Sequence, residues 1–427
     1  MPESIFHKIH INLDTLEVFV LAFLVFLGVL SERLLPLAAI AGIVFLLIRL
    51  AWRRRIRMFW PVDLPVLILL AMLALSMFVV TALPEKSAPQ ALRLLGGIWL
   101  FYAVIRWGRI SARRFGLAAV GYLGVGLALS VGAFFTVDWF TKFSFIPTGF
   151  IKAISPVISD TVQPNVLAGS LVLILAGMAG GLVFGWKVLW KWQQILLVVM
   201  LLFMTGILVL TQSRGALMGL GAGLLLMIML RFRRGWIAVP VCLVLLVGLV
   251  LAVGPDRFFG SLDQTQSQVS SLEGREEIWS RAVMMIGDFP FTGVGISTFG
   301  NVADTLYPFF LNSPGSVPHA HNLYLQVAVD LGIPGFAAWL AIWGSVIYSA
   351  WKLFQTGIKH SIVWQAALGA ALLCTQVAMG VHGLWDAVTW GTRPAVLVWA
   401  IWGTAIAGRY YLKSHLRDIP QTDLEYQ

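Results

Sequence analysis

Long apolar runs recur along the whole chain and constrain its fold more than any other feature. About 20 helical residues cross the hydrocarbon core of a bilayer, so an apolar run of about 18 or more predicts a membrane-spanning helix. Of the 427 residues, 59% are hydrophobic and only 12% are charged. A β-barrel is excluded, because its strands are shorter and alternate in polarity. The sequence therefore predicts an all-α polytopic membrane protein.

Short basic segments separate the apolar runs and predict about 12 spans. These are residues 15–31, 34–51, 60–82, 90–107, 115–136, 165–186, 194–211, 214–231, 236–254, 322–350, 361–382 and 394–411. On this division the first nine spans fill residues 1–254, a large loop covers 255–320, the last three spans fill 321–411, and 412–427 form a tail. We expect the large loop to be partly helical.

Positive charge is unevenly divided between the two sides of the predicted membrane. When the basic separators are placed on one side with Lys8 and Arg49, that side holds 20 of the 30 Lys and Arg residues and the other side holds 10. Cytoplasmic loops carry the excess of positive charge. Both termini are therefore expected in the cytoplasm, and the large loop on the outer face, which is the periplasm for a bacterial inner membrane.

The charge and the cysteines exclude several other classes. The net charge of +10 is scattered among short loops, whereas nucleic-acid binding needs a continuous basic surface, so no nucleic-acid partner is expected. Cys242 and Cys374 each fall inside an apolar run, and we expect both to be buried without a disulfide or a metal. No cleavable signal peptide and no obligate protein partner are indicated.

Two histidines stand just before the tenth predicted span. Pro318 suits the first turn of a helix, and Ser316 could cap it. The positive end of that helix would then lie beside both imidazoles, disfavour their protonation and leave a neutral base. A structural role as cap or interfacial anchor is the alternative. Steps of three and four residues would align one polar face: His319, Asn322, Gln326 and Asp330.

The large loop contains two local patterns. Residues 274–286 predict a helix that lies on the membrane surface or packs against the spans, and Gly287 and Pro290 should end it. Its apolar stripe is Ile278, Trp279, Ala282, Val283 and Ile286. Residues 293–298 are rich in glycine but lack the third glycine and the βαβ context of a phosphate-binding loop, so a turn is predicted.

Two arginines are candidates for binding an anion. A guanidinium can hold a phosphate through two hydrogen bonds. The alternatives are an interfacial anchor for Arg214 and a solvated ion pair with a neighbouring glutamate for Arg275. Lys86 and Arg93 are weaker candidates, each with an ordinary loop charge as its alternative. The outer loops contain no Asp-x-Asp pair and no cluster at metal-ligand spacing, so no metal or other cofactor is expected.

Together these motifs resemble the O-antigen ligase and O-antigen polymerase superfamily. Its histidine motif is similar to His321-Asn322, nine residues, then Gly332 and Gly335. Its arginine turn is similar to residues 212–216, and the core of its periplasmic loop to residues 274–279 and 290–299. Residues 163–165 resemble a further feature. The likeness covers about residues 160–390, and the N-terminal third matches in topology only.

The resemblance implies a metal-independent, inverting glycosyltransferase with a GT-C-like fold. Such an enzyme takes a glycan from undecaprenyl diphosphate on the periplasmic face and passes it to the lipid A core oligosaccharide. His321 would be the general base or orient the acceptor, and His319 is the second-choice base. Asn322 would orient His321 or the acceptor. The diphosphate would be bound by Arg214 and Arg275, with Lys86 as a third positive group.

Three other functions remain open. A polymerase of O-antigen or exopolysaccharide would share the donor and differ only in its acceptor. A protein O-oligosaccharyltransferase would pass the glycan to protein hydroxyls. A polysaccharide transporter would require symmetric halves and ionisable groups near the bilayer midplane, and the sequence displays neither. Asp386 would bind a sugar, orient a histidine or end a helix.

Overall fold

The computed structural model describes residues 3–30, 34–53, 59, 61–137, 139, 162–254, 272–392 and 395–415. Within these ranges the regular secondary structure is helical. The helices are α1 (Glu3–Leu30), α2 (Leu35–Arg53), α3 (Asp63–Leu75), α4 (Pro84–Gly108), α5 (Ala112–Thr136), α7 (Pro164–Gly185), α8 (Lys191–Leu210), α9 (Arg214–Arg231), α10 (Ala238–Val253), α12 (Leu272–Asp288), α13 (Phe299–Leu306), α14 (Leu323–Lys359), α15 (Val363–His382), α16 (Val388–Gly391) and α17 (Val396–His415). Most of the predicted loop 137–164, the first part of the large loop and most of the tail lie outside the described residues.

Every predicted span overlaps one of the long helices. In the described part of the chain, nine helical segments are long and apolar enough to cross a membrane: Asp63–Val80, Pro84–Gly108, Ala112–Thr136, Pro164–Val188, Lys191–Leu210, Arg214–Arg231, Gly235–Val253, Leu323–Lys359 and Val363–His382. The chain is thus an all-α polytopic membrane protein. The other three predicted spans fall on α1, α2 and α17, and their crossing of the membrane stays a prediction.

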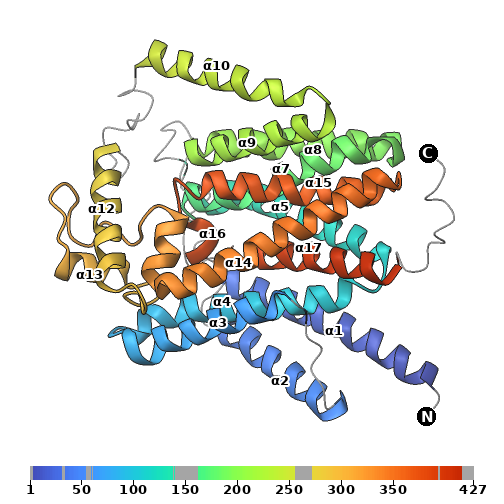
Figure 1. Ribbon diagram of the computed structural model, residues 1–427, viewed down its shortest axis with the longest axis horizontal. Coiled ribbons are helices and arrows are strands. Elements are labelled where there is room, and N and C mark those ends of the chain that lie inside the picture. The colour runs from blue at the N-terminus through green and yellow to red at the C-terminus, as the bar shows by residue number, and fades with distance from the viewer. Residues whose placement is uncertain are drawn as a thin grey trace.

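The bundle is organised around α7 and α15, which pack against each other (Figure 1). α15 also packs against α9 and α14, while α17 packs against α4. α10 lies at the edge of the bundle, where most of its apolar side chains are exposed. A helix that is apolar on all sides and leaves them uncovered is suited to lipid. Cys374 is buried in α15 as predicted, but Cys242 is exposed on α10, so that prediction was wrong.

Buried charges join the first helices at the end of the bundle away from α12 and α13. Glu17 of α1 is 1% exposed and accepts from Arg106 of α4 at 2.5 Å and from Arg49 of α2. Arg49 also donates to Asp14 at 2.7 Å. Arg49, counted above among the basic residues of the cytoplasmic side, and Arg106 are therefore ion-pair partners inside the protein, where removing one partner of a buried pair would be strongly destabilising.

α14 is broken near its start by Gly332, which has φ of +68°. The break leaves backbone groups that the preceding loop satisfies: Val294 N donates to Val329 O at 2.8 Å, and Ile333 N donates to Pro290 O at 2.7 Å. A side chain at Gly332 would meet the backbone of Phe291 at 2.8 Å. Glycine is required here by both the backbone angle and the space. The glycine-rich segment 293–298 is a turn, as predicted, and it braces the broken helix.

The helix predicted in the large loop is α12, and it ends at Asp288 close to the predicted stop. Its buried stripe is Ile278, Ala282 and Met285, whereas Val283 is 58% exposed, so Val283 was placed wrongly. Ile278, Ala282 and Met285 form a small core with residues of the neighbouring helices: Phe299 and Ala303 of α13 and Val329 of α14. α12 is therefore packed against the helix bundle through its own core, which is one of the two predicted arrangements.

Candidate active site

The histidine motif lies where α14 begins and α15 ends, on the side of the bundle that carries α12 and α13 (Figure 1). Leu323 N donates to Gly383 O at 2.7 Å, and Asn322 Nδ2 donates to Leu384 O at 3.2 Å. These two bonds hold the histidine segment against residues 383–386. Two segments about 60 residues apart in sequence are thereby brought together.

Asn322 caps α14, and this corrects the predicted start of the helix. Its side-chain oxygen accepts from Tyr324 N and Leu325 N, each at 3.0 Å. The helix begins at Leu323, so Pro318 is not in its first turn and Ser316 is not its cap. A side-chain acceptor at the cap satisfies backbone donors that the helix leaves open. Both histidines therefore precede the helix. Of the four residues predicted to share a polar face, only Gln326 and Asp330 lie within α14.

The two imidazoles lie against each other. Their ring centroids are 4.1 Å apart, and His321 N donates to His319 Nδ1 at 3.2 Å. Since Nδ1 of His319 accepts, a neutral His319 carries its proton on Nε2. His321 has φ of +47°, a backbone conformation that is uncommon for residues other than glycine and that concentrates at functional sites.

Burial lowers the pKa of His321 to about 3, and the neighbouring His319 and Arg275 act in the same direction, while the carboxylate of Asp386 opposes them. Burial also lowers the pKa of His319. Both side chains are only partly covered at the surface, although protein surrounds them on most sides. The neutral imidazole predicted from the helix dipole is thus favoured, but the main cause is desolvation.

Asp386 completes the histidine cluster. Its carboxylate and the ring nitrogens of His319 and His321 all lie within 4.8 Å of one another. Burial raises the pKa of Asp386, whereas the surrounding imidazoles and the hydrogen bond that its carboxylate accepts from Ala387 N at 2.7 Å lower it, so that the pKa lies below its usual value. Two imidazoles and a carboxylate form a donor set that a transition metal could use, and the sequence spacing did not reveal it. The guanidinium of Arg275 nearby favours an anion over a cation at this place.

Both candidate arginines lie close to Trp385, the residue that precedes Asp386. The Arg275 guanidinium lies over the Trp385 ring, 5.8 Å from its centroid. A Cβ at Gly215, next to Arg214, would meet Trp385 Cβ at 2.8 Å, so the arginine turn packs directly on this tryptophan. Burial and Arg214 lower the pKa of Arg275, while Asp386 raises it. Two guanidinium groups from α9 and α12 therefore face one region together with the histidine cluster.

The sequence left open an ion pair between Arg275 and a neighbouring glutamate. Glu277 does not form this pair. Glu277 instead pairs with Arg281 at 3.8 Å and accepts from the backbone of Phe310 and Leu311. These hydrogen bonds lower the pKa of Glu277 although partial burial opposes them. Glu277 thus ties α12 to the following loop and does not pair with Arg275.

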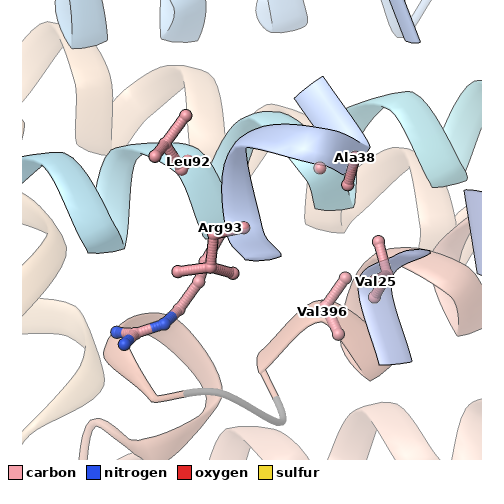
Figure 2. Close-up of a pocket in the computed structure, with 7 residues that line it drawn as sticks. Val25, Ala38, Leu92, Arg93 and Val396 are labelled. Carbon is pink, nitrogen blue, oxygen red and sulfur yellow. The ribbon is translucent and has the colours of Figure 1, made fainter. Parts of the chain in front are cut away.

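Lys86 and Arg93 are the two weaker basic candidates. Lys86, near the start of α4, is exposed and donates to Asn301 of α13 at 3.2 Å. Arg93 extends from α4 past a small apolar pocket toward the turn of α16 (Figure 2). There its Nη1 donates to Gly391 O at 3.0 Å, so Arg93 supports α16 and is more than a loop charge.

The sequence did not identify the side chain that anchors the histidine segment. Asp330 is fully buried and accepts from Trp390 and Gln326, each at 2.8 Å. Ser297 N and Gln90 Nε2 donate to it at 3.3 and 3.4 Å. Gln326 in turn accepts from Ala320 N at 2.7 Å, directly between the two histidines. Asp330 therefore connects α4, α14, α16 and the 293–298 turn to the catalytic candidate.

His382 is the second residue that sequence reasoning missed. It is fully buried, and neither ring nitrogen has a hydrogen-bond partner among the described residues. Gly169 of α7 and Gly219 of α9 leave the space for it, because a Cβ at either would meet His382 at 2.9 and 3.2 Å. Only the assembled bundle reveals this position, since the glycines belong to two other helices.

The fold and the site define a class of protein: a polytopic membrane protein with histidines, a carboxylate and two arginines gathered at one end of its helices. Residues 199–340 match the family model described as O-antigen ligase. This match, over about a third of the chain, includes Arg214, Arg275 and His321 and supports the O-antigen ligase and polymerase superfamily indicated by the motifs. That family implies a glycosyltransferase-type enzyme. A comparison with curated proteins gave no match.

Proposed function

We propose that this protein transfers a glycan from undecaprenyl diphosphate to the lipid A core oligosaccharide on the periplasmic face of a bacterial inner membrane. The observation that carries the proposal is the meeting of His321 with Arg275 and Arg214 around Trp385 and Asp386. All three residues lie inside the region that matches the O-antigen ligase family.

The reaction needs a base at the acceptor and positive charge at the leaving group. His321, as a neutral imidazole, would take the proton of the acceptor hydroxyl while that oxygen attacks the anomeric carbon. The bond from this carbon to the diphosphate breaks, and the carrier leaves with the electron pair. Arg275 and Arg214 would stabilise the negative charge that develops there. The proposed transfer is inverting and needs no metal, because the two guanidinium groups supply the positive charge.

The remaining polar residues have supporting parts in this proposal. Asn322 caps α14 and holds residue 384, so it orients the histidine segment rather than the acceptor. His319 orients His321 through its Nδ1 and is the second-choice base. Lys86 would supply a third positive charge from the start of α4, where it donates to Asn301 of α13. We also propose that both termini lie in the cytoplasm, because the side that holds 20 of the 30 Lys and Arg residues would be cytoplasmic under the positive-inside rule.

Replacing Arg275 with lysine tests the diphosphate clamp. Lysine keeps the charge but loses the planar pair of donors. Charge-assisted hydrogen bonds contribute about 1.5–3 kcal/mol, so transfer should fall about 10- to 100-fold. Arg214→Lys should behave alike. Arg281→Lys is the matched control, because Arg281 is on the same helix but contacts Pro308 and Glu277. Unchanged transfer by both clamp variants in a purified assay would assign them to anchoring.

The runner-up is a polymerase that joins lipid-linked repeats. Lipopolysaccharide gels of a strain lacking the protein distinguish the two. Loss of all polymer from the core supports the ligase, and a single repeat left on the core supports the polymerase. Polymer of normal length and amount would overturn both. Protein O-oligosaccharyltransfer would instead remove glycan from proteins and leave these gels unchanged, and transport of substrate without a covalent product would identify a transporter.

A further inference from the structure

A second cavity lies at the end of the bundle opposite the histidine cluster. It has a volume of about 380 Å³ and is enclosed by α5, α7, α15 and α17, with a contribution from α8. The residues of α7 that line it run from Leu173 to Gly185, the half of the helix away from Pro164. Ala112 at the start of α5 and Trp364 at the start of α15 lie at the end of the cavity that is farther from the histidine cluster. The cavity is therefore separate from the site proposed for glycan transfer.

The wall of this cavity offers nothing to a polar ligand. Among the residues that the structure describes, those that line the cavity carry no charged side chain. Its hydroxyl groups are already paired: Tyr122 with Thr404 at 2.6 Å, and Thr375 with Leu173 O at 2.9 Å. A cavity with satisfied hydroxyls and otherwise apolar walls favours a hydrocarbon occupant. Inside a membrane the available hydrocarbon is a lipid chain.

The depth of the cavity agrees with one leaflet of a bilayer. Leu173 and Gly185 are twelve residues apart on α7, which corresponds to about 18 Å along a helix. Half of a hydrocarbon core of about 30 Å is about 15 Å. A single acyl chain that enters at the end near Ala112 and Trp364 would thus lie along the cavity as far as the bilayer midplane.

The end of the cavity at Ala112 and Trp364 carries the features of a membrane interface. Trp186, Trp190 and Trp192 are 43%, 72% and 61% exposed and flank Val188 and Leu189, which line the cavity. Tryptophan is enriched at the level of lipid headgroups. Three exposed cations adjoin lining residues in the sequence: Arg113 follows Ala112, Lys187 precedes Val188, and Lys191 lies two residues after Leu189. Residues 109–116 and 185–194 contain no acidic residue, so this rim is complementary to an anionic headgroup.

We propose that this cavity binds one anionic phospholipid, with an acyl chain between α5, α7 and α15 and its phosphate at the rim formed by Arg113, Lys187 and Lys191. Each cation near a membrane surface contributes about a fivefold preference for anionic over neutral lipid. The lipid is a structural ligand at the other end of the bundle from the glycan donor. The proposal does not depend on glycan transfer, and its test measures binding.

Native mass spectrometry of the purified protein with equal amounts of phosphatidylglycerol and phosphatidylcholine tests the proposal. The wild-type protein should retain one phosphatidylglycerol in preference to phosphatidylcholine. Gly116→Leu should lose it, because Gly116 lines the cavity and a Cβ there meets nothing within 4 Å. Gly121→Leu is the matched control on the same helix, with equally open space but outside the cavity, and should retain the lipid.

The exposed rim provides a variant that does not disturb the interior. Lys187→Ala should lower the ratio of retained phosphatidylglycerol to phosphatidylcholine about fivefold without changing the elution of the folded protein. Equal retention of the two lipids by the wild type would overturn the assignment of the rim. Equal retention by Gly116→Leu and Gly121→Leu would overturn the assignment of the cavity, and so would a retained polyprenyl lipid in place of phosphatidylglycerol.

Discussion

Replacing His321 with alanine should lower glycan transfer about 10²- to 10⁴-fold, which is the usual contribution of a general base. Burial lowers the pKa of His321 to about 3, which favours the unprotonated imidazole that the proposed proton transfer requires. Its φ of +47° is a second reason to expect function, since such a conformation persists only when its surroundings impose it.

The assay should compare His321→Ala with His319→Ala in purified protein supplied with lipid-linked glycan and acceptor. We expect the larger loss for His321, since Nδ1 of His319 is already engaged by the backbone of its neighbour. A larger loss for His319 would exchange the two assignments. A chelator in the same assay should leave the wild-type rate unchanged. Activity that disappears with the chelator and returns with a divalent cation would instead assign a metal to the His319–His321–Asp386 cluster.

Removing the Asp330 carboxylate should have the largest effect on stability. Asp330→Ala leaves the buried donors of Trp390, Gln326 and Gln90 without their acceptor. Each buried donor left without an acceptor costs about 1–3 kcal/mol, so the melting temperature of the detergent-solubilised protein should fall strongly. Asp330→Asn keeps one acceptor oxygen and should lie between alanine and the wild type. A melting temperature equal to that of the wild type for Asp330→Ala would contradict the anchoring role.

The Gln326→Ala variant tests whether Gln326 positions the histidine segment or only stabilises the fold. It removes the link between Asp330 and Ala320 N and should lower the transfer rate while donor binding is kept, because the histidine segment loses its support. Gln376→Ala is the matched control: this buried glutamine accepts from Trp343 and Trp402 and makes no contact with the histidines. Equal losses of transfer in the two variants would mean that Gln326 acts only through stability.

The membrane class, the positions of the long helices and the candidate residues His321, Arg214 and Arg275 follow from sequence alone. Apolar length predicts spans because the bilayer sets a fixed thickness. The eighth predicted span begins and ends with α9, Arg214–Arg231, because charged residues mark both of its ends. The motifs at residues 212–216, 274–279 and 321–335 also share a family likeness, which the match over residues 199–340 supports.

Only the tertiary structure decided how these motifs combine. The cap at Asn322 was missed because proline and serine upstream offered equally good local signals, and the bond from Asn322 to Leu384 O depends on α15. Asp386 joined the histidines, and Asp330 became an acceptor for three other segments, through contacts that span 33 to 240 residues in sequence. Local sequence patterns reflect the bilayer and the helix, which act on neighbouring residues. The polar site depends instead on which helix ends meet, and that is decided by packing in three dimensions.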